Sequence, residues 1–270
     1  MFGKLVKYEM KSMMKIFLLA WGAILVVALI NGINLSFEFG SGETTFRARE
    51  MFSVIPIILY GFLVCGIIVM ALVFVIQRFY KGLLGDEGYL MFTLPTTARK
   101  LILAKSFSAA LVVIISGLVG MLSVFLMVLP SMGAAEWKAV FDGIQFTLRE
   151  YPITVPAVLL GILMCILSAV TFIYQVYASV AIGHLSAKHR MLFSVLAFIG
   201  IMVVLQTITI LLGTVGIESR WVRQILDSSI WQTDKAMLVV MGIVCLEKAV
   251  MATVYHVITE YILRKKLNLE

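Results

Sequence analysis

Six long apolar runs dominate the hydrophobic pattern of this chain, and polar residues gather between them. Five of the runs carry no charge, while the sixth carries Glu247 and Lys248 near its middle. A helix that crosses a bilayer needs about 20 predominantly apolar residues, and the runs lack the short alternating segments of a membrane barrel. The pattern therefore predicts an all-α integral membrane protein with a single transmembrane domain over residues 1–270. The expected spans are residues 16–35, 54–76, 107–129, 155–182, 191–212 and 236–258.

The composition excludes most other classes of protein. Hydrophobic residues make up 61% of the chain and charged residues 14%, whereas ordinary soluble domains are about 45–50% apolar and about 25% charged. A soluble enzyme and a disordered chain are both excluded on this basis. The three cysteines, Cys65, Cys165 and Cys245, all fall inside expected spans, which indicates apolar packing rather than disulfides or metal ligands. No convincing small-x-small cleavage site follows the first run, so we expect it to remain as a span.

The charges are distributed unevenly across the expected membrane. Of the 22 Lys and Arg residues, 14 lie on the side of the two termini, 7 lie in the opposite loops, and Lys248 lies within a span. Acidic residues run the other way, so that the formal charge is +9 on the first side and −2 on the other. The positive-inside rule places both termini in the cytoplasm. Because the cations are dispersed and belong to no binding module, we expect no nucleic-acid partner.

The N-terminal segment, residues 2–15, is amphipathic. Its apolar positions, among them Met10, Met13 and Met14, can face lipid while four lysines face the phosphates. This spacing predicts an interfacial helix that leads into the first span. A plain basic anchor is the alternative.

The longest cytoplasmic loop, residues 77–106, interleaves aromatic, acidic and basic residues and exceeds most connections in length. Pro95 interrupts it, and Thr96 or Thr97 can cap a new helix beyond it. The apolar face of this helix would be Leu101, Ile102 and Ala104. We expect such a segment to lie on the cytoplasmic membrane surface and to offer side chains to a soluble protein.

The amino-acid sequence of this loop resembles that of the cytoplasmic loop between the second and third spans of bacterial ABC-2-type exporter permeases. The basic phrase His184–Arg190 and the C-terminal phrase Tyr261–Glu270 are also similar to those of this family. The resemblance covers essentially the whole chain, from an N-terminal interfacial helix through six spans. The residues of the loop phrase are Tyr89, Leu90, Thr93, Leu94, Pro95 and Lys105.

The resemblance implies that the energy comes from a separate ABC ATPase subunit, which would carry ATP and magnesium. This chain agrees with that division of labour, because it has no Gly-x-x-x-x-Gly-Lys-[Ser/Thr] loop and so would bind no cofactor itself. The ATPase would dock on a coupling helix after the second span, with aromatic and arginine residues as the first candidates for its anchors. Anchoring of the same residues to lipid headgroups is the alternative. The docking residues would be Arg78, Phe79, Tyr80, Lys81, Leu83, Leu84, Asp86 and Glu87.

Two stretches on the opposite side carry apolar residues at helical spacing, residues 131–152 around Trp137 and residues 213–235 around Trp221. Both predict short amphipathic helices at the outer surface. In the family, helices before the last span dip into the membrane as an outer gate, which the second stretch resembles. A belt of tryptophan at the outer headgroups explains the same residues equally well.

Charged residues inside a span are costly and face the bundle or a cavity. For Glu247 and Lys248 we favour structural pairing with neighbouring helices over a role in a pathway, and both possibilities stay open. Catalytic sets are absent from the sequence. His256 and Glu260 lie four residues apart on one helix face, but a metal needs more ligands. Other candidates for polar contacts in the membrane are Asn31, Asn34, Gln175, Gln206 and Thr207.

These observations favour the permease subunit of an ATP-driven exporter in the bacterial cytoplasmic membrane. Six spans would be half of the translocation unit, so a second copy or a sister permease would complete it. The substrate would be amphipathic, such as a peptide antibiotic, a drug or a lipid. A membrane scaffold or sensor that holds a soluble partner without transport is the alternative, and the lack of a catalytic set argues against a membrane enzyme.

Overall fold

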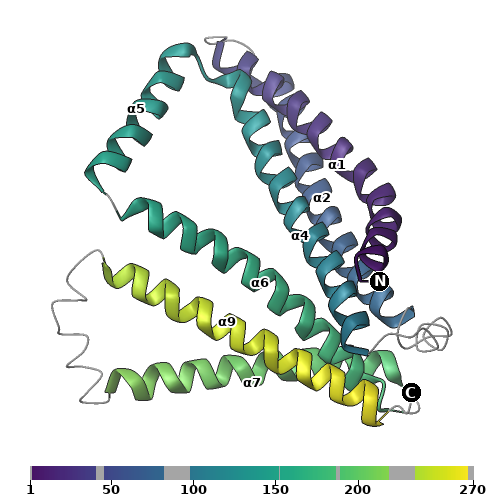
Figure 1. Cartoon of the computed structure of the whole chain (residues 1–270). Helices are drawn as coiled ribbons and strands as arrows, with labels where there is room; N and C mark the ends of the chain where they lie inside the picture. The colour runs from purple at the N-terminus through teal and green to yellow at the C-terminus, as the bar shows by residue number, and fades with distance from the viewer. Residues whose placement is uncertain are drawn as a thin grey trace. The chain divides into compact units, whose positions relative to one another are not determined.

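The computed structural model describes residues 2–40, 46–81, 98–151, 153–186, 189–218 and 235–266. Every regular element in these ranges is helical (Figure 1). The long helices are α1 (Phe2–Gly40), α2 (Phe46–Phe79), α4 (Ala98–Val128), α5 (Ala134–Glu150), α6 (Thr154–Gly183), α7 (Arg190–Glu218) and α9 (Lys235–Tyr261). Two short turns follow α4 and α9: η2 (Leu129–Ser131) and η3 (Ile262–Lys266).

Six of these helices are long and apolar enough to cross a membrane, all except α5. Their apolar stretches are Leu5–Ser36, Val54–Phe79, Arg99–Ser131, Thr154–Gly183, Arg190–Ile208 and Met237–Arg264. Because an isolated helix satisfies its own backbone hydrogen bonds, each can enter lipid without unpaired polar groups. The prediction of a multi-pass, all-α membrane protein is therefore confirmed.

The helices group into two compact units. The first comprises residues 1–75 and 107–150, and the second comprises residues 76–106 and 151–270. Helices α2 and α4 contribute to both, because the boundaries fall within them. No feature of the sequence marks this division.

The core of the first unit joins α1, α2 and α4. Met13, Phe17, Trp21 and Val112 form a buried cluster, and the Trp21 indole Nε1 donates to Ser116 Oγ at 3.0 Å. The expectation that Met13 faces lipid is wrong, because this side chain is 1% exposed and packs on protein. The N-terminal segment is also not a separate interfacial helix. Helix α1 runs without a break from Phe2, so its first turns and the first span form one continuous helix.

Further along α1, Gly32 permits a close approach of two helices. A Cβ at this position would lie 2.8 Å from the carbonyl oxygen of Met127 and 2.9 Å from that of Leu126. Asn31 is buried beside it and donates from Nδ2 to the carbonyl oxygen of Pro56 at 3.0 Å. The prediction that Asn31 makes a polar contact between helices is confirmed. Small residues and interhelical hydrogen bonds take the place of the hydrophobic effect within a bilayer.

Helix α5 ends the first unit. It has no buried residue, and its apolar side chains follow one face. Trp137 on that face packs edge-on against Phe125 of α4, with ring centroids 5.5 Å apart. The expected amphipathic helix within residues 131–152 is confirmed. The corresponding expectation for residues 213–235 falls mostly outside the described residues, which contain its first turns at the end of α7 and its last residue at the start of α9.

In the second unit, α6 packs against α9 and α7, and α9 lies beside α6 in Figure 1. In the C-terminal half of α6, from Thr171 onward, ten of the thirteen residues are buried, whereas Phe172 is 41% exposed. The Thr171 hydroxyl lies 2.7 Å from the carbonyl oxygen of Leu167 and 2.9 Å from that of Lys248, so its one proton is shared between α6 itself and α9. At its end, Gly183 approaches α7 so closely that an added Cβ would overlap Ser194.

Candidate functional site at the basic end of the second unit

The part of the molecule that positions the predicted docking loop is the end of the second unit where its basic residues gather. We call it the basic end, and the charge distribution predicts it to be cytoplasmic. Two segments leave and re-enter the helices here: the outgoing stem, residues 77–81, and the return stem, residues 98–106. The predictions for the loop between them lie outside the described residues. They are those for Leu83, Leu84, Asp86, Glu87, Tyr89, Leu90, Thr93, Leu94 and Pro95, together with the coupling helix.

The outgoing stem is held on α6 by aromatic rings. Phe79 is 0% exposed and stacks on Tyr177, with ring centroids 4.1 Å apart and planes inclined by 18°. Tyr80 meets His184 edge-on at 5.4 Å. Aromatic pairs of this kind stabilise a contact by about 0.5–1.5 kcal/mol beyond the area that they bury. The stacked ring therefore makes the last turn of α2 part of the α6 surface.

Phe79 is thus placed differently from our expectation. A docking knob must be accessible to a partner, but this ring is enclosed by the chain itself. Tyr80 and Lys81 are exposed, while Arg78 is half-buried and engaged in a contact of its own. Among the described residues of the predicted docking set, Tyr80 and Lys81 are the ones that present free surface.

The return stem is the beginning of α4 rather than a separate surface helix. Helix α4 is described from Ala98 and continues unbroken into the third span, while the predicted cap at Thr96 or Thr97 lies outside the described residues. The predicted apolar face of Leu101, Ile102 and Ala104 is 0% exposed. It is buried in protein and does not lie on the membrane surface. Lys105, from the loop phrase, is 1% exposed and also makes a contact.

A hydrogen bond joins the end of the return stem to α6. Ser106 Oγ lies 2.8 Å from the Tyr174 hydroxyl and 3.2 Å from the carbonyl oxygen of Leu103. Because a carbonyl can only accept, the Ser106 hydroxyl donates to Leu103, and the Tyr174 hydroxyl donates to Ser106. The buried Ser106 hydroxyl therefore both donates and accepts, and its contact with Tyr174 ties α4 to α6.

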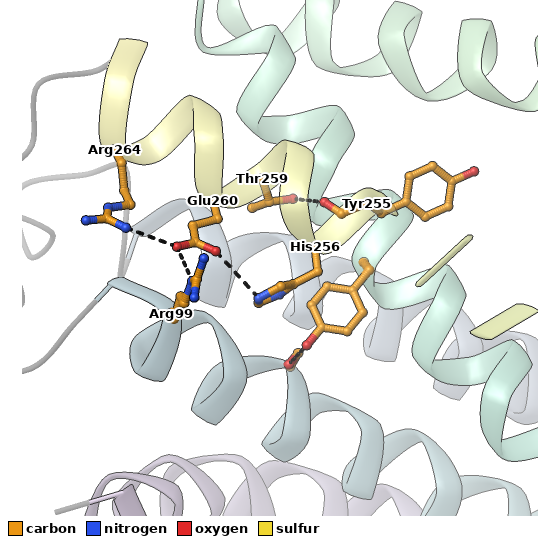
Figure 2. A network of polar contacts seen from close by, with 8 residues as sticks. Arg99, Tyr255, His256, Thr259, Glu260 and Arg264 are labelled. Atoms are coloured by element: carbon orange, nitrogen blue, oxygen red, sulfur yellow. Dashed lines mark hydrogen bonds and ion pairs between the residues drawn. The ribbon is translucent and has the colours of Figure 1, made fainter. Parts of the chain in front are cut away.

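The return stem is also tied to α9 through a buried carboxylate. Glu260, whose side chain is 8% exposed, accepts from Arg99 Nε at 2.5 Å. Arg264 Nη1 lies 3.4 Å from the same oxygen, and His256 Nε2 lies 4.0 Å from the other. Figure 2 shows the three side chains converging on the carboxylate. We call Arg99, His256, Glu260 and Arg264 the Glu260 cluster.

The physical reason for this cluster is the cost of burying a charge. A carboxylate that is removed from water needs cationic and hydrogen-bonding partners to remain ionised. Of the cationic partners, Arg264 lies one turn after Glu260, in η3, and Arg99 comes from a segment 161 residues away. His256, one turn before Glu260, adds a charge only when its imidazole is protonated. Arg99 supplies a cationic partner for the buried Glu260 carboxylate and thereby links α9 to the return stem.

The two stems meet through one continuous series of contacts. Tyr177, which stacks on Phe79, packs edge-on against Tyr174 at 6.3 Å, and Tyr174 packs edge-on against His256 at 5.2 Å. His256 and Tyr174 lead in turn to the Glu260 cluster and to Ser106. Both ends of the loop are therefore fixed on the same pair of helices, α6 and α9.

Glu260 was not among the residues singled out for a role from the sequence. Its spacing from His256 suggests only a possible metal ligand. The nearby His and Arg residues are the one sequence signal that could have indicated this cluster. Within the described part of the chain, no group of three His, Cys, Asp or Glu side chains is placed to hold a metal ion.

Glu247 and Lys248 lie in α9 at a distance from the stems. The sequence favours pairing with neighbouring helices, but the two adjacent residues pair with each other, Lys248 Nζ lying 3.5 Å from Glu247 Oε1. Both side chains are partly exposed, at 43% for Glu247 and 34% for Lys248. No hydrogen bond or ion pair joins either side chain to another helix within the described residues.

Comparisons of this chain with known protein families, with curated proteins and with solved structures found no match.

Proposed function

We propose that this chain is the membrane-spanning permease subunit of an ATP-driven exporter, energised by a separate ABC ATPase that docks on the loop of residues 77–106. The observation that carries the proposal is the double anchoring of this loop. Phe79 fixes one stem on α6, and Arg99 fixes the other on α9. A loop that served only to connect two spans would need neither contact.

Double anchoring gives a docked protein a mechanical hold on the membrane helices. Motion passes between distant sites through packed side chains and rigid elements, whereas a flexible connection absorbs it. A displacement of the loop would act on Tyr177 through the stacked ring and on Glu260 through the guanidinium. Both residues belong to long helices that span the membrane, so the displacement would reach the membrane interior.

The remaining parts of the proposal follow from the resemblance and the charge distribution. ATP and magnesium would be held by the ATPase, and a second copy of this chain or a sister permease would complete the pathway. The termini and the basic end would face the cytoplasm of a bacterial cell, and the substrate would be an amphipathic peptide, drug or lipid moved outward.

The first test is co-purification of the chain with any ABC ATPase that is found encoded beside its gene, followed by ATP hydrolysis in lipid vesicles. We expect Tyr80→Ala combined with Lys81→Glu to weaken the association, because these two side chains are exposed on the outgoing stem. Lys138→Glu, an exposed basic residue on α5 outside this loop, is the matched control for a change of charge. Unchanged association in the double variant would contradict docking at this stem.

A second test separates a transporter from a scaffold. In a transporter, Arg99→Ala should leave the ATPase bound but lower the number of molecules moved per ATP hydrolysed, because the return stem would lose its ion pair to α9. A scaffold would show the same binding with no transport in the unmodified protein. Binding without transport would thus favour the alternative in which the chain holds a partner.

A further inference from the structure

Glu247 and Lys248 place two formal charges near the middle of the last span. The apolar stretch of α9 extends from Met237 to Arg264, and the two residues lie well inside it. Nearby positions on the helix, such as Leu246 and Val250, are apolar and more than half exposed. The charged pair is therefore an isolated polar patch in an otherwise apolar helix surface.

The orientation of this patch is set by the packing of α9 on α6. Cys245, Ala252 and Tyr255 are the buried residues around the pair. The backbone at Lys248 accepts the hydrogen bond from Thr171. Rotation of α9 to hide the charges would break this hydrogen bond and expose the buried stripe. The pair consequently stays at the margin of the helix contact, where both side chains are partly exposed.

Neither lipid nor mutual pairing satisfies these groups. A charged residue at the centre of a span costs about 2.5–3.5 kcal/mol on insertion scales. Adjacent residues on a helix point about 100° apart, so their contact is poor, and here it is 3.5 Å long. An ammonium has three donors and a carboxylate has about four acceptor sites, so most of their hydrogen-bonding capacity remains open. The patch requires water or a polar ligand.

We propose that Glu247 and Lys248 form a binding site, on a water-accessible face of α9, for a zwitterionic group of the transported molecule. The ammonium of the ligand would lie on Glu247, and its carboxylate or phosphate on Lys248. Because the pair is neutral as a whole, it is complementary to a ligand that carries both charges rather than to one of a single sign. The site rests on the proposed function in that its ligand is the cargo.

The chemistry admits two sources of such a group, the unblocked ends of a peptide and the headgroup of phosphatidylethanolamine. In the headgroup, and in a peptide of only two or three residues, an ammonium lies close to an anion in the same molecule. The experiment below distinguishes them by using one probe of each kind.

Water access is tested first, on the full chain without its ATPase in lipid vesicles. Starting from a variant in which Cys65, Cys165 and Cys245 are replaced by Ala, single cysteines are introduced at 247, 248 and 246. We expect a membrane-impermeant charged thiol reagent to modify the first two and not the third, although Leu246 is 67% exposed. Equal labelling at 246, or none at 247 and 248, would overturn the proposal.

Ligand binding is tested with both charges in place and a reporter cysteine one turn away, Met251→Cys. Soluble dihexanoyl-phosphatidylethanolamine or a short unblocked dipeptide should slow thiol labelling at 251 several-fold, and the N-acetylated form of the effective probe should not. The protection should be lost in Glu247→Gln and in Lys248→Met.

Protection by the lipid probe alone would identify a headgroup site, and protection by the dipeptide alone a peptide site. Lack of protection by both, or protection that persists in the two variants, would overturn the proposal. Because the ATPase is absent from these measurements, a negative result here leaves the docking test independent, and failure of docking leaves this site measurable.

Discussion

Single residues at the basic end have distinct roles that their positions in the sequence do not reveal. Phe79 and Tyr80 are adjacent, yet one is enclosed on Tyr177 and the other is 39% exposed. A substitution of the first should act on the fold, and a substitution of the second on binding. The same separation applies to Arg99 and Lys100 on the return stem, where only the first reaches Glu260.

We expect Phe79→Ala to destabilise the purified chain by about 3 kcal/mol, because truncation of a buried phenylalanine removes its contacts and leaves a cavity. Tyr80→Ala should change stability by well under 1 kcal/mol, since its side chain is partly in solvent. Denaturant unfolding in detergent, followed by helical circular dichroism, measures both. Equal losses in the free energy of unfolding for the two variants would show that the stacked Phe79 ring contributes no more to stability than Tyr80.

The ion pair between Arg99 and Glu260 should appear as coupling between the two residues. Arg99→Ala and Glu260→Ala should each destabilise the chain, and the double variant should lose less than the sum, with a coupling of about 0.5–1 kcal/mol. The low value reflects the exposure of the Arg99 side chain, 67%. A double-mutant cycle with the same unfolding measurement tests this. The control cycle uses Lys100→Ala in place of Arg99→Ala. Additive losses in the Arg99 cycle would show that the ion pair does not stabilise the contact between α9 and the return stem.

At the scale of helices, close approach depends on two glycines. Gly32 lies against backbone oxygens of α4, and Gly183 lies against Ser194 of α7. Backbone atoms cannot move aside as a flexible side chain can, so an added methyl group must separate the helices. Such contacts are how helices associate where lipid offers no hydrophobic driving force.

Gly32→Ala and Gly183→Ala should each destabilise the protein by about 1–3 kcal/mol, the usual cost of overpacking. Gly22→Ala, in the same helix as Gly32, is the control for Gly32→Ala. Gly200→Ala, in the helix α7 that Gly183 approaches, is the control for Gly183→Ala. A Cβ at either control position meets nothing within 4 Å. Thermal unfolding in detergent micelles distinguishes the pairs. Equal melting temperatures for test and control variants would show that the helices can move apart to accommodate the added methyl group without a loss of stability.

The hydrophobic pattern predicts the six spans and α5, because helical periodicity and run length are local properties. It fails at the ends of helices. The segments before Ile16 and before Phe107 contain charges, yet both continue the neighbouring helix without interruption. Some of their polar residues, among them Glu9 and Arg99, have partners in the protein, and only the folded contacts decide that.

For the whole molecule, the sequence predicts where the loop lies and not how it is held. The anchors of the two stems are Tyr177 and Glu260, which are remote in the chain from the residues that they contact. No local periodicity encodes such a choice of partner. Glu247 shows the converse, since its unusual position is plain in the sequence while its partial exposure is known only from the structure.

The uneven distribution of charge predicts the orientation of the whole molecule. A cysteine at Gln145, on exposed helix α5, should react with an impermeant thiol reagent in intact cells. A cysteine at Lys100, which is also exposed, should react only after the cells are permeabilised. Labelling in a background without native cysteines measures both, and the opposite pattern would reverse the predicted topology.

The position of Glu260 in the chain has a consequence for biogenesis. The return stem is synthesised well before the carboxylate that holds Arg99, which lies 161 residues later, in α9. Until that helix has been inserted, the loop has only part of its support. A chain arrested before α9 would therefore expose a loop whose return stem lacks its ion pair to Glu260.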